Sequence, residues 1–245
     1  MSGPTAILSA LAPEQQGLIE QLEGPQQVQR AGRTFWQGRL RGHPVVLALS
    51  RIGKVAAATT TTALIEAFGV QRVVFTGVAG GLGPAVQIGD LVVADAFVQH
   101  DMDASPLFPR FEVPLYDQHR FPCDAALTQQ LAQACQASLG AAGRTPRLHQ
   151  GLILSGDQFV STTQEATRIQ SAVRGAGLEP LAVEMEGAAV AQVCHDYGIA
   201  FAAVRTISDR ADEASAQDFQ HFVTHVASHY ARAVVGALMP LLPAG

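Results

Sequence analysis

Short apolar runs alternate along the chain with longer alanine-rich stretches in which apolar residues recur at helical spacing. The short runs predict strands and the long stretches predict helices, and this alternation is typical of an α/β domain. The expected strands are 6–11, 34–40, 45–50, 72–76, 90–100, 150–155 and 199–207, and a further apolar run occupies 181–186. The expected helices are 14–22, 53–68, 124–139, 163–173, a stretch ending at 197, and a long amphipathic one at 215–242.

Turn and cap residues mark several boundaries between these elements. Gly42-His43-Pro44 separates two strands and predicts a hairpin, and Asp124 is a candidate helix N-cap. The strand 72–76 leads into a glycine cluster at 77–81, which predicts a turn where backbone and ligand come close.

The segment 100–122 departs from the alternating pattern. Its prolines exclude a regular helix, whereas its apolar residues favour burial. These apolar residues are Leu107, Phe108, Phe111 and Leu115. Two interpretations stay open: a functional or interface loop, and a loop packed over its own domain.

Composition narrows the class of protein. The 245 residues are 48% hydrophobic and 15% charged, which excludes an intrinsically disordered chain. Sixteen basic and 21 acidic residues give a net charge of −5 without a concentrated basic face, so no nucleic-acid partner is expected. No linker, repeat or low-complexity tract divides the sequence, and we expect a single domain over 1–245.

Cysteine, histidine and the apolar windows exclude further classes. The three cysteines have no CxxC spacing and the histidines no metal-ligand spacing, so neither a disulfide framework nor a metal site is expected. The first residues lack the basic region of a signal peptide, and no apolar window reaches the length of a membrane span. We therefore expect a soluble cytoplasmic protein without a membrane partner.

Carboxylates stand where apolar runs end. Glu184 and Glu186 close the run that begins at 181, Asp209 follows the strand 199–207, and Glu14 follows the first strand. Open α/β sheets bind ligands beyond the carboxyl ends of their strands, so these acids and the glycine cluster are expected to gather there. Each acid also has a local explanation. Glu14 and Glu186 could be first-turn helix acids, and Asp209 could cap a turn.

Six segments, taken in order, resemble one enzyme family. They are Ala10-Leu11-Ala12-Pro13-Glu14, Ser50-Arg51-Ile52-Gly53-Lys54-Val55-Ala56, Thr76-Gly77-Val78-Ala79-Gly80-Gly81, Ser155-Gly156-Asp157-Gln158-Phe159-Val160, Val183-Glu184-Met185-Glu186 and Arg205-Thr206-Ile207-Ser208-Asp209. The chain resembles the bacterial 5′-methylthioadenosine/S-adenosylhomocysteine nucleosidases of the purine nucleoside phosphorylase superfamily. The resemblance implies a three-layer α-β-α sandwich around a twisted mixed β-sheet, a homodimer, and no metal or organic cofactor.

The resemblance also implies a role for each matching residue. The reaction is hydrolysis of an adenine N-glycosidic bond, in which an acid protonates the leaving base and a carboxylate activates water. Asp209 is the expected acid at adenine N7 and Glu14 the expected base. Glu186 would accept the ribose hydroxyls, Phe159 would stack on adenine, and Arg205 would orient Glu184 or the bound water. The other expected substrate-binding residues are Ile52, Val78, Ala79, Gly80, Val160, Met185, Ser208 and Phe219, and Leu107 and Phe108 would complete the 5′ pocket from a partner subunit.

Four places differ from the usual family pattern. In the first segment Leu11-Ala12-Pro13 precede the single Glu14, where Met followed by further acids is usual. Arg51 stands where glycine is frequent, Val78 where serine is typical, and Arg210 where an apolar residue is common. A cation beside Asp209 would lower the pKa of this acid, unless Arg210 points to solvent or to Asp212.

Three alternative functions stay open on the sequence. A phosphorylase needs an anion site, for which Arg51 is the one candidate, and Phe75 stands where phosphorylases tend to place arginine. A futalosine-type nucleosidase shares the acids and differs in the 5′ pocket. A non-enzymatic adenosine-binding module would use Phe159 and Asp209 but would not need Glu14.

Overall fold

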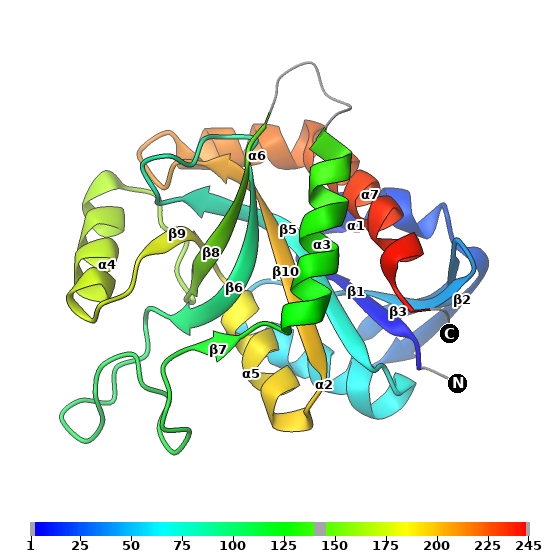
Figure 1. Ribbon diagram of the computed structural model, residues 1–245, viewed down its shortest axis with the longest axis horizontal. Helices are drawn as coiled ribbons and strands as arrows, with labels where there is room; N and C mark the ends of the chain where they lie inside the picture. Colours follow the sequence, from blue (N-terminus) through cyan, green and yellow to red (C-terminus); the bar gives the residue numbers. More distant parts are fainter. Residues whose placement is uncertain (1–2, 140–145, 244–245) are drawn as a thin grey trace.

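A computed structural model describes residues 3–139 and 146–243 (Figure 1). Within them, ten strands form one sheet. The strands are β1 (Thr5–Ser9), β2 (Glu23–Arg30), β3 (Arg33–Leu40), β4 (His43–Leu49), β5 (Arg72–Gly81), β6 (Leu91–Gln99), β7 (Phe121–Pro122), β8 (Leu148–Ser155), β9 (Pro180–Glu184) and β10 (Ala200–Asp209). The helices are α1 (Ala12–Ile19), α2 (Lys54–Phe68), α3 (Ala125–Ser138), α4 (Thr163–Gly175), α5 (Gly187–Tyr197), α6 (Ser215–His225) and α7 (Ala227–Leu238), followed by the 3-10 turn η2 (Met239–Leu241).

Parallel and antiparallel pairs mix in this sheet. Strand β1 pairs in parallel with β4 and β5, and β5 pairs in parallel with β10. The β2–β3–β4 ribbon and the β6–β10 and β5–β9 pairs are antiparallel. Because β5 pairs with both β9 and β10, the strands β5, β10, β6, β8 and β9 close into a ring.

Helices cover both faces of the sheet, because the strands carry apolar side chains on both faces. Side chains of a strand alternate between faces, so Ala6 and Leu8 of β1 lie in one core and Ile7 lies in another. The first core includes residues of α2 and α5, and the second includes residues of α1, α3 and α7 (Figure 1). This arrangement confirms the three-layer α-β-α fold.

Most predicted elements are present, with two corrections in the regular structure. The glycine cluster 77–81 is not a turn. It continues β5 to Gly81, because β10 pairs along it as far as the partners Gly80 and Asp209. The long C-terminal helix is divided at Val226, whose φ of −125° is not helical, so α6 and α7 are separate.

The proline-rich segment is packed over its own domain in part, and the interpretation as an interface loop stays a prediction. Phe111 and Val113 are buried against the chain's own core, whereas Leu107 and Leu115 are 85% and 88% exposed. Among the described residues, no helix combines the length and hydropathy of a membrane span.

Candidate active site

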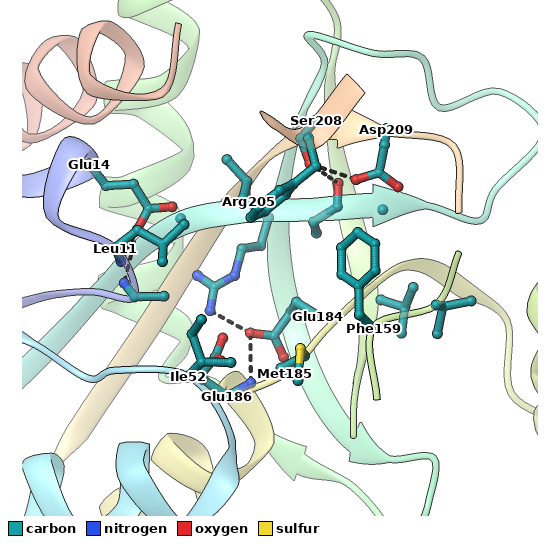
Figure 2. A pocket seen from close by; sticks show the side chains of 18 of the residues that line it. Leu11, Glu14, Ile52, Phe159, Glu184, Met185, Glu186, Arg205, Ser208 and Asp209 are labelled. Atoms are coloured by element: carbon teal, nitrogen blue, oxygen red, sulfur yellow. Dashed lines mark hydrogen bonds and ion pairs between the residues drawn. The ribbon is translucent and has the colours of Figure 1, made fainter. Parts of the chain in front are cut away.

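A cavity of about 300 Å³ opens where β1, β5, β9 and β10 end (Figure 2). Its lining consists of Ala10, Leu11, Glu14, Ile52, Gly77, Val78, Ala79, Gly80, Gln158, Phe159, Val160, Val183, Glu184, Met185, Glu186, Arg205, Ser208, Asp209 and Phe219. The structure thus brings together every residue that the sequence predicted for the site, except Leu107 and Phe108. These two do not line the cavity of a single chain, and their contribution from a partner stays a prediction.

Glu14 enters the cavity from the first turn of α1. Its Oε2 accepts the backbone N–H groups of Ala10 and Leu11 at 2.9 and 2.8 Å, and these bonds fix the carboxylate at the helix start. Its Oε1 is buried and has no hydrogen-bond partner within the described residues. Burial raises the pKa of Glu14 to about 7, against the opposing effects of the Leu11 N–H and the Arg205 charge. A base with such a pKa can accept a proton near neutral pH.

Glu184 is held by the protein itself. Its Oε2 lies 2.7 Å from Arg205 Nη2, and both side chains are almost fully buried. The same carboxylate accepts the N–H of Gly187 at the start of α5 and the hydroxyl of Ser155. The Arg205 guanidinium also lies 4.0 Å above the centre of the Phe75 ring. The sequence had left it open whether Arg205 orients Glu184 or water, and the structure provides the contact with Glu184.

Glu186 has fewer protein partners than Glu184. Its Oε1 accepts the backbone N–H of Gly53 at 2.8 Å, the one hydrogen bond of this carboxylate among the described residues. Burial, and next the charge of Glu184, raise the pKa of Glu186. The carboxylate therefore has free acceptor capacity toward the cavity, which suits a ligand that donates hydrogen bonds.

Asp209 stands across the cavity from Glu14 (Figure 2). Its Oδ1 accepts the N–H of Ala211 at 2.9 Å, and its Oδ2 accepts the Ser208 hydroxyl at 2.8 Å. A Cβ on Gly80 would lie 2.9 Å from Oδ1, so a side chain at position 80 would displace the acid. Burial raises the pKa of Asp209, although the N–H of Ala211 and the hydroxyl of Ser208 oppose this effect.

Arg210 does not turn toward this acid. Its guanidinium donates to the backbone carbonyls of Gly83 and Val86 instead. The Arg210 cation therefore does not reverse the effect of burial, which raises the pKa of Asp209 above its ordinary value.

Two aromatic rings form an apolar wall. Phe159 and Phe219 meet edge to face with their ring centroids 5.5 Å apart, and Phe159 is 40% exposed. Figure 2 shows Phe159 near Asp209 and Met185 near Glu184 and Glu186. A planar ring can stack on Phe159 while its edge lies within reach of Asp209.

Some lining residues were missed by the sequence analysis. They are Ala10 and Leu11, which precede Glu14 by four and three positions, and Gln158 and Val183, each next to a predicted residue. Gly77 also lines the cavity and belongs to the glycine cluster that was expected there. Gly53 was also missed as a donor to the site, although it begins the expected helix 53–68, where the first backbone N–H groups have no partner within the helix. The described residues contain no cluster of three or more side chains suited to hold a metal ion.

Comparisons with known proteins agree with this geometry. The family model described as Phosphorylase superfamily matches residues 4–239. This match covers most of the chain, so the protein belongs to the phosphorylase superfamily, and its mixed α/β sheet agrees with that class.

The more particular family follows from individual relatives. A Mycobacterium tuberculosis 5′-methylthioadenosine/S-adenosylhomocysteine nucleosidase is 35% identical over all of both chains, and the Geobacillus kaustophilus enzyme of that name is 38% identical over 95% of each. The crystal structure of the Neisseria meningitidis nucleosidase in complex with methylthio-immucillin-A has a TM-score of 0.89 at 34% identity, covering 98% of this chain and 100% of that one. A Colwellia psychrerythraea nucleosidase in complex with adenine has a TM-score of 0.88 at 31% identity, over 97% and 95%. The chain belongs to the 5′-methylthioadenosine/S-adenosylhomocysteine nucleosidase family.

Proposed function

We propose that this protein hydrolyses the N-glycosidic bond of 5′-methylthioadenosine and S-adenosylhomocysteine and releases adenine. The observation that carries the proposal is the placement of Glu14 and Asp209 on opposite sides of one cavity, which Glu186 also lines. Hydrolysis with an activated water needs an acid and a base on opposite faces of the sugar, with space between them for the water.

The steps follow from the positions of the acids. Asp209 donates a proton to N7 of adenine as the bond from the base to C1′ of the ribose breaks. A water molecule attacks C1′, and its proton passes to Glu14, whose Oε1 faces no protein partner. Glu186 accepts hydrogen bonds from the ribose hydroxyls. Phe159 stacks on the base, a contact that contributes about 1–3 kcal/mol per base.

The position of Arg51 outside the cavity favours water over phosphate as the nucleophile. Its guanidinium donates to the backbone carbonyl of Gly32, and Arg51 is not among the residues that line the cavity. Arg205 does reach the cavity but is paired with Glu184. A phosphate dianion would therefore meet the Glu14 carboxylate without an available guanidinium to neutralise it.

We also propose a homodimer that completes the 5′ end of the pocket. Ile52 on the cavity rim is 58% exposed, Val55 is 78% exposed, and Leu107 is 85% exposed. A second copy would bury these side chains and bring Leu107 and Phe108 to the pocket. Sedimentation velocity should give a dimer for the wild type and a monomer for Val55→Asp, and a monomeric wild type would refute this assembly.

The activity is tested by release of the free base from methylthioadenosine, adenosylhomocysteine, futalosine and inosine, each with and without phosphate. We expect rapid cleavage of the first two substrates at a rate independent of phosphate. Cleavage that requires phosphate would show that the enzyme is a phosphorylase and not a hydrolase. Faster cleavage of futalosine than of the first two substrates would show that the 5′ pocket binds the futalosine substituent. Binding of adenosine without cleavage of any substrate would show that the protein is a non-enzymatic binding module.

A further inference from the structure

Lys54 is the first residue of α2, and its side chain connects the β4–α2 loop to the end of β6 and the segment that follows it. Its Nζ donates to Asp101 Oδ1 at 2.6 Å and to Gln99 Oε1 at 3.0 Å. The side chain is 17% exposed and that of Asp101 is 32% exposed, so the ion pair is only partly screened by water. Lys54 is the one lysine of the chain.

A second set of contacts closes a ring with this ion pair. Asp101 Oδ2 accepts the backbone N–H of Asp157 at 2.9 Å, and Asp157 Oδ1 accepts the backbone N–H of Lys54 at 2.8 Å. This Lys54–Asp101–Asp157 ring connects the β4–α2 loop, the segment after β6 and the segment after β8. The last of these segments continues directly to Phe159.

The ring confines Gly53, the residue before Lys54. Gly53 has a φ of +94°, and a Cβ there would lie 3.1 Å from Asp157 Oδ1, so glycine is required. Its N–H is the donor that holds Glu186 Oε1 at 2.8 Å. A shift of the ring would therefore move the donor that orients Glu186.

We propose that Lys54, Asp101 and Asp157 are positioning residues, which fix the Gly53 N–H so that Glu186 presents its second oxygen to the ribose. This inference rests on the proposed function, because it concerns how the sugar is held for cleavage. None of the three side chains lines the cavity, so their effect must pass through Gly53 and Glu186.

Two substitutions break the ring without removing an element. Lys54→Met keeps the alkyl chain and removes the ammonium group. Asp101→Asn keeps one acceptor oxygen and places an N–H₂ group against one of the two donors, either the Lys54 ammonium or the N–H of Asp157. Glu179→Gln is the matched control, because Glu179 forms an exposed ion pair with Arg174 at 2.9 Å outside the site. Thermal melting of every variant establishes that it is folded.

We expect kcat/KM for methylthioadenosine to fall about ten- to a hundredfold in both ring variants, mainly through a higher KM. The control should equal the wild type. In a Glu186→Gln background, Lys54→Met should have little further effect, since the ring acts through that carboxylate. A merely structural role would give the same loss in both backgrounds.

Equal losses in the two backgrounds, or unchanged kinetics in both ring variants, would overturn the inference. Lack of nucleosidase activity in the wild type would instead overturn the proposed function, and the inference with it. The two failures are therefore distinguished before any variant is compared.

Discussion

Replacing Glu14 by glutamine tests the proposed base through both stability and activity. The glutamine carbonyl can accept the same N–H groups of Ala10 and Leu11 that Oε2 accepts, at 2.9 and 2.8 Å. Its amide nitrogen then takes the place of Oε1, which has no partner within the described residues. The substitution therefore removes the ionisable group and keeps the shape of the helix start.

The magnitude follows from the pKa of Glu14, which burial raises from 4.5 to about 7. Between these values the unfolded chain has lost the proton while the folded chain keeps it, so the unfolding free energy of the wild type falls as pH rises. Each pKa unit corresponds to about 1.4 kcal/mol, so the full loss is about 3 kcal/mol. As the pH rises from 5 to 8, the unfolding free energy of Glu14→Gln should therefore increase by about 2–3 kcal/mol relative to that of the wild type.

Urea unfolding followed by the fluorescence of Trp36, the one tryptophan, measures this difference at the two pH values. The expected gain corresponds to a rise of about 4–12 °C in Tm relative to the wild type. Glu20→Gln is the control, since Glu20 is exposed at the end of the same helix. A difference between Glu14→Gln and wild type that does not change with pH would refute the assignment of a buried acid.

The same variant should lose turnover by about 10²–10⁴-fold, the usual contribution of a general base. The variant should still bind adenine, because Glu14 lies across the cavity from Asp209 and Phe159, where adenine is proposed to bind. In the wild type, the rate of adenine release should rise with pH through about 7 as Glu14 ionises. Full activity of Glu14→Gln would exclude Glu14 as the base.

Three further substitutions separate the other roles. Asp209→Asn removes the proton for N7 and should lower kcat about 10²–10⁴-fold in an adenine-release assay; an unchanged kcat would exclude it as the acid. Phe159→Ala removes the stacking ring and should raise KM by about 5- to 150-fold, whereas a loss confined to kcat would contradict stacking. Arg205→Met leaves the buried Glu184 carboxylate without its cation and should lower the unfolding free energy by about 3–5 kcal/mol, measured with urea; a change below 1 kcal/mol would argue against the pair.

Local patterns were sufficient to predict most elements and the meeting of the acids. Apolar periodicity reports which face of an element is buried, and parallel strands end at the same edge of a sheet. For this reason Glu14, Glu186 and Asp209 could be expected in one cavity before any contact was known. Strand β2 was missed because its residues are mostly polar and exposed, so no alternation marked it.

The sequence by itself therefore determined the order of the elements, their buried faces and the residue types at the site. Only the tertiary structure decided which of two neighbouring acids is held by Arg205 and which remains available to a ligand. It also decided that the glycine cluster is a strand end against β10 and that Gly53 donates to Glu186, 133 positions away. Such contacts depend on the register and closure of the whole sheet, and a local pattern of residues does not contain that register.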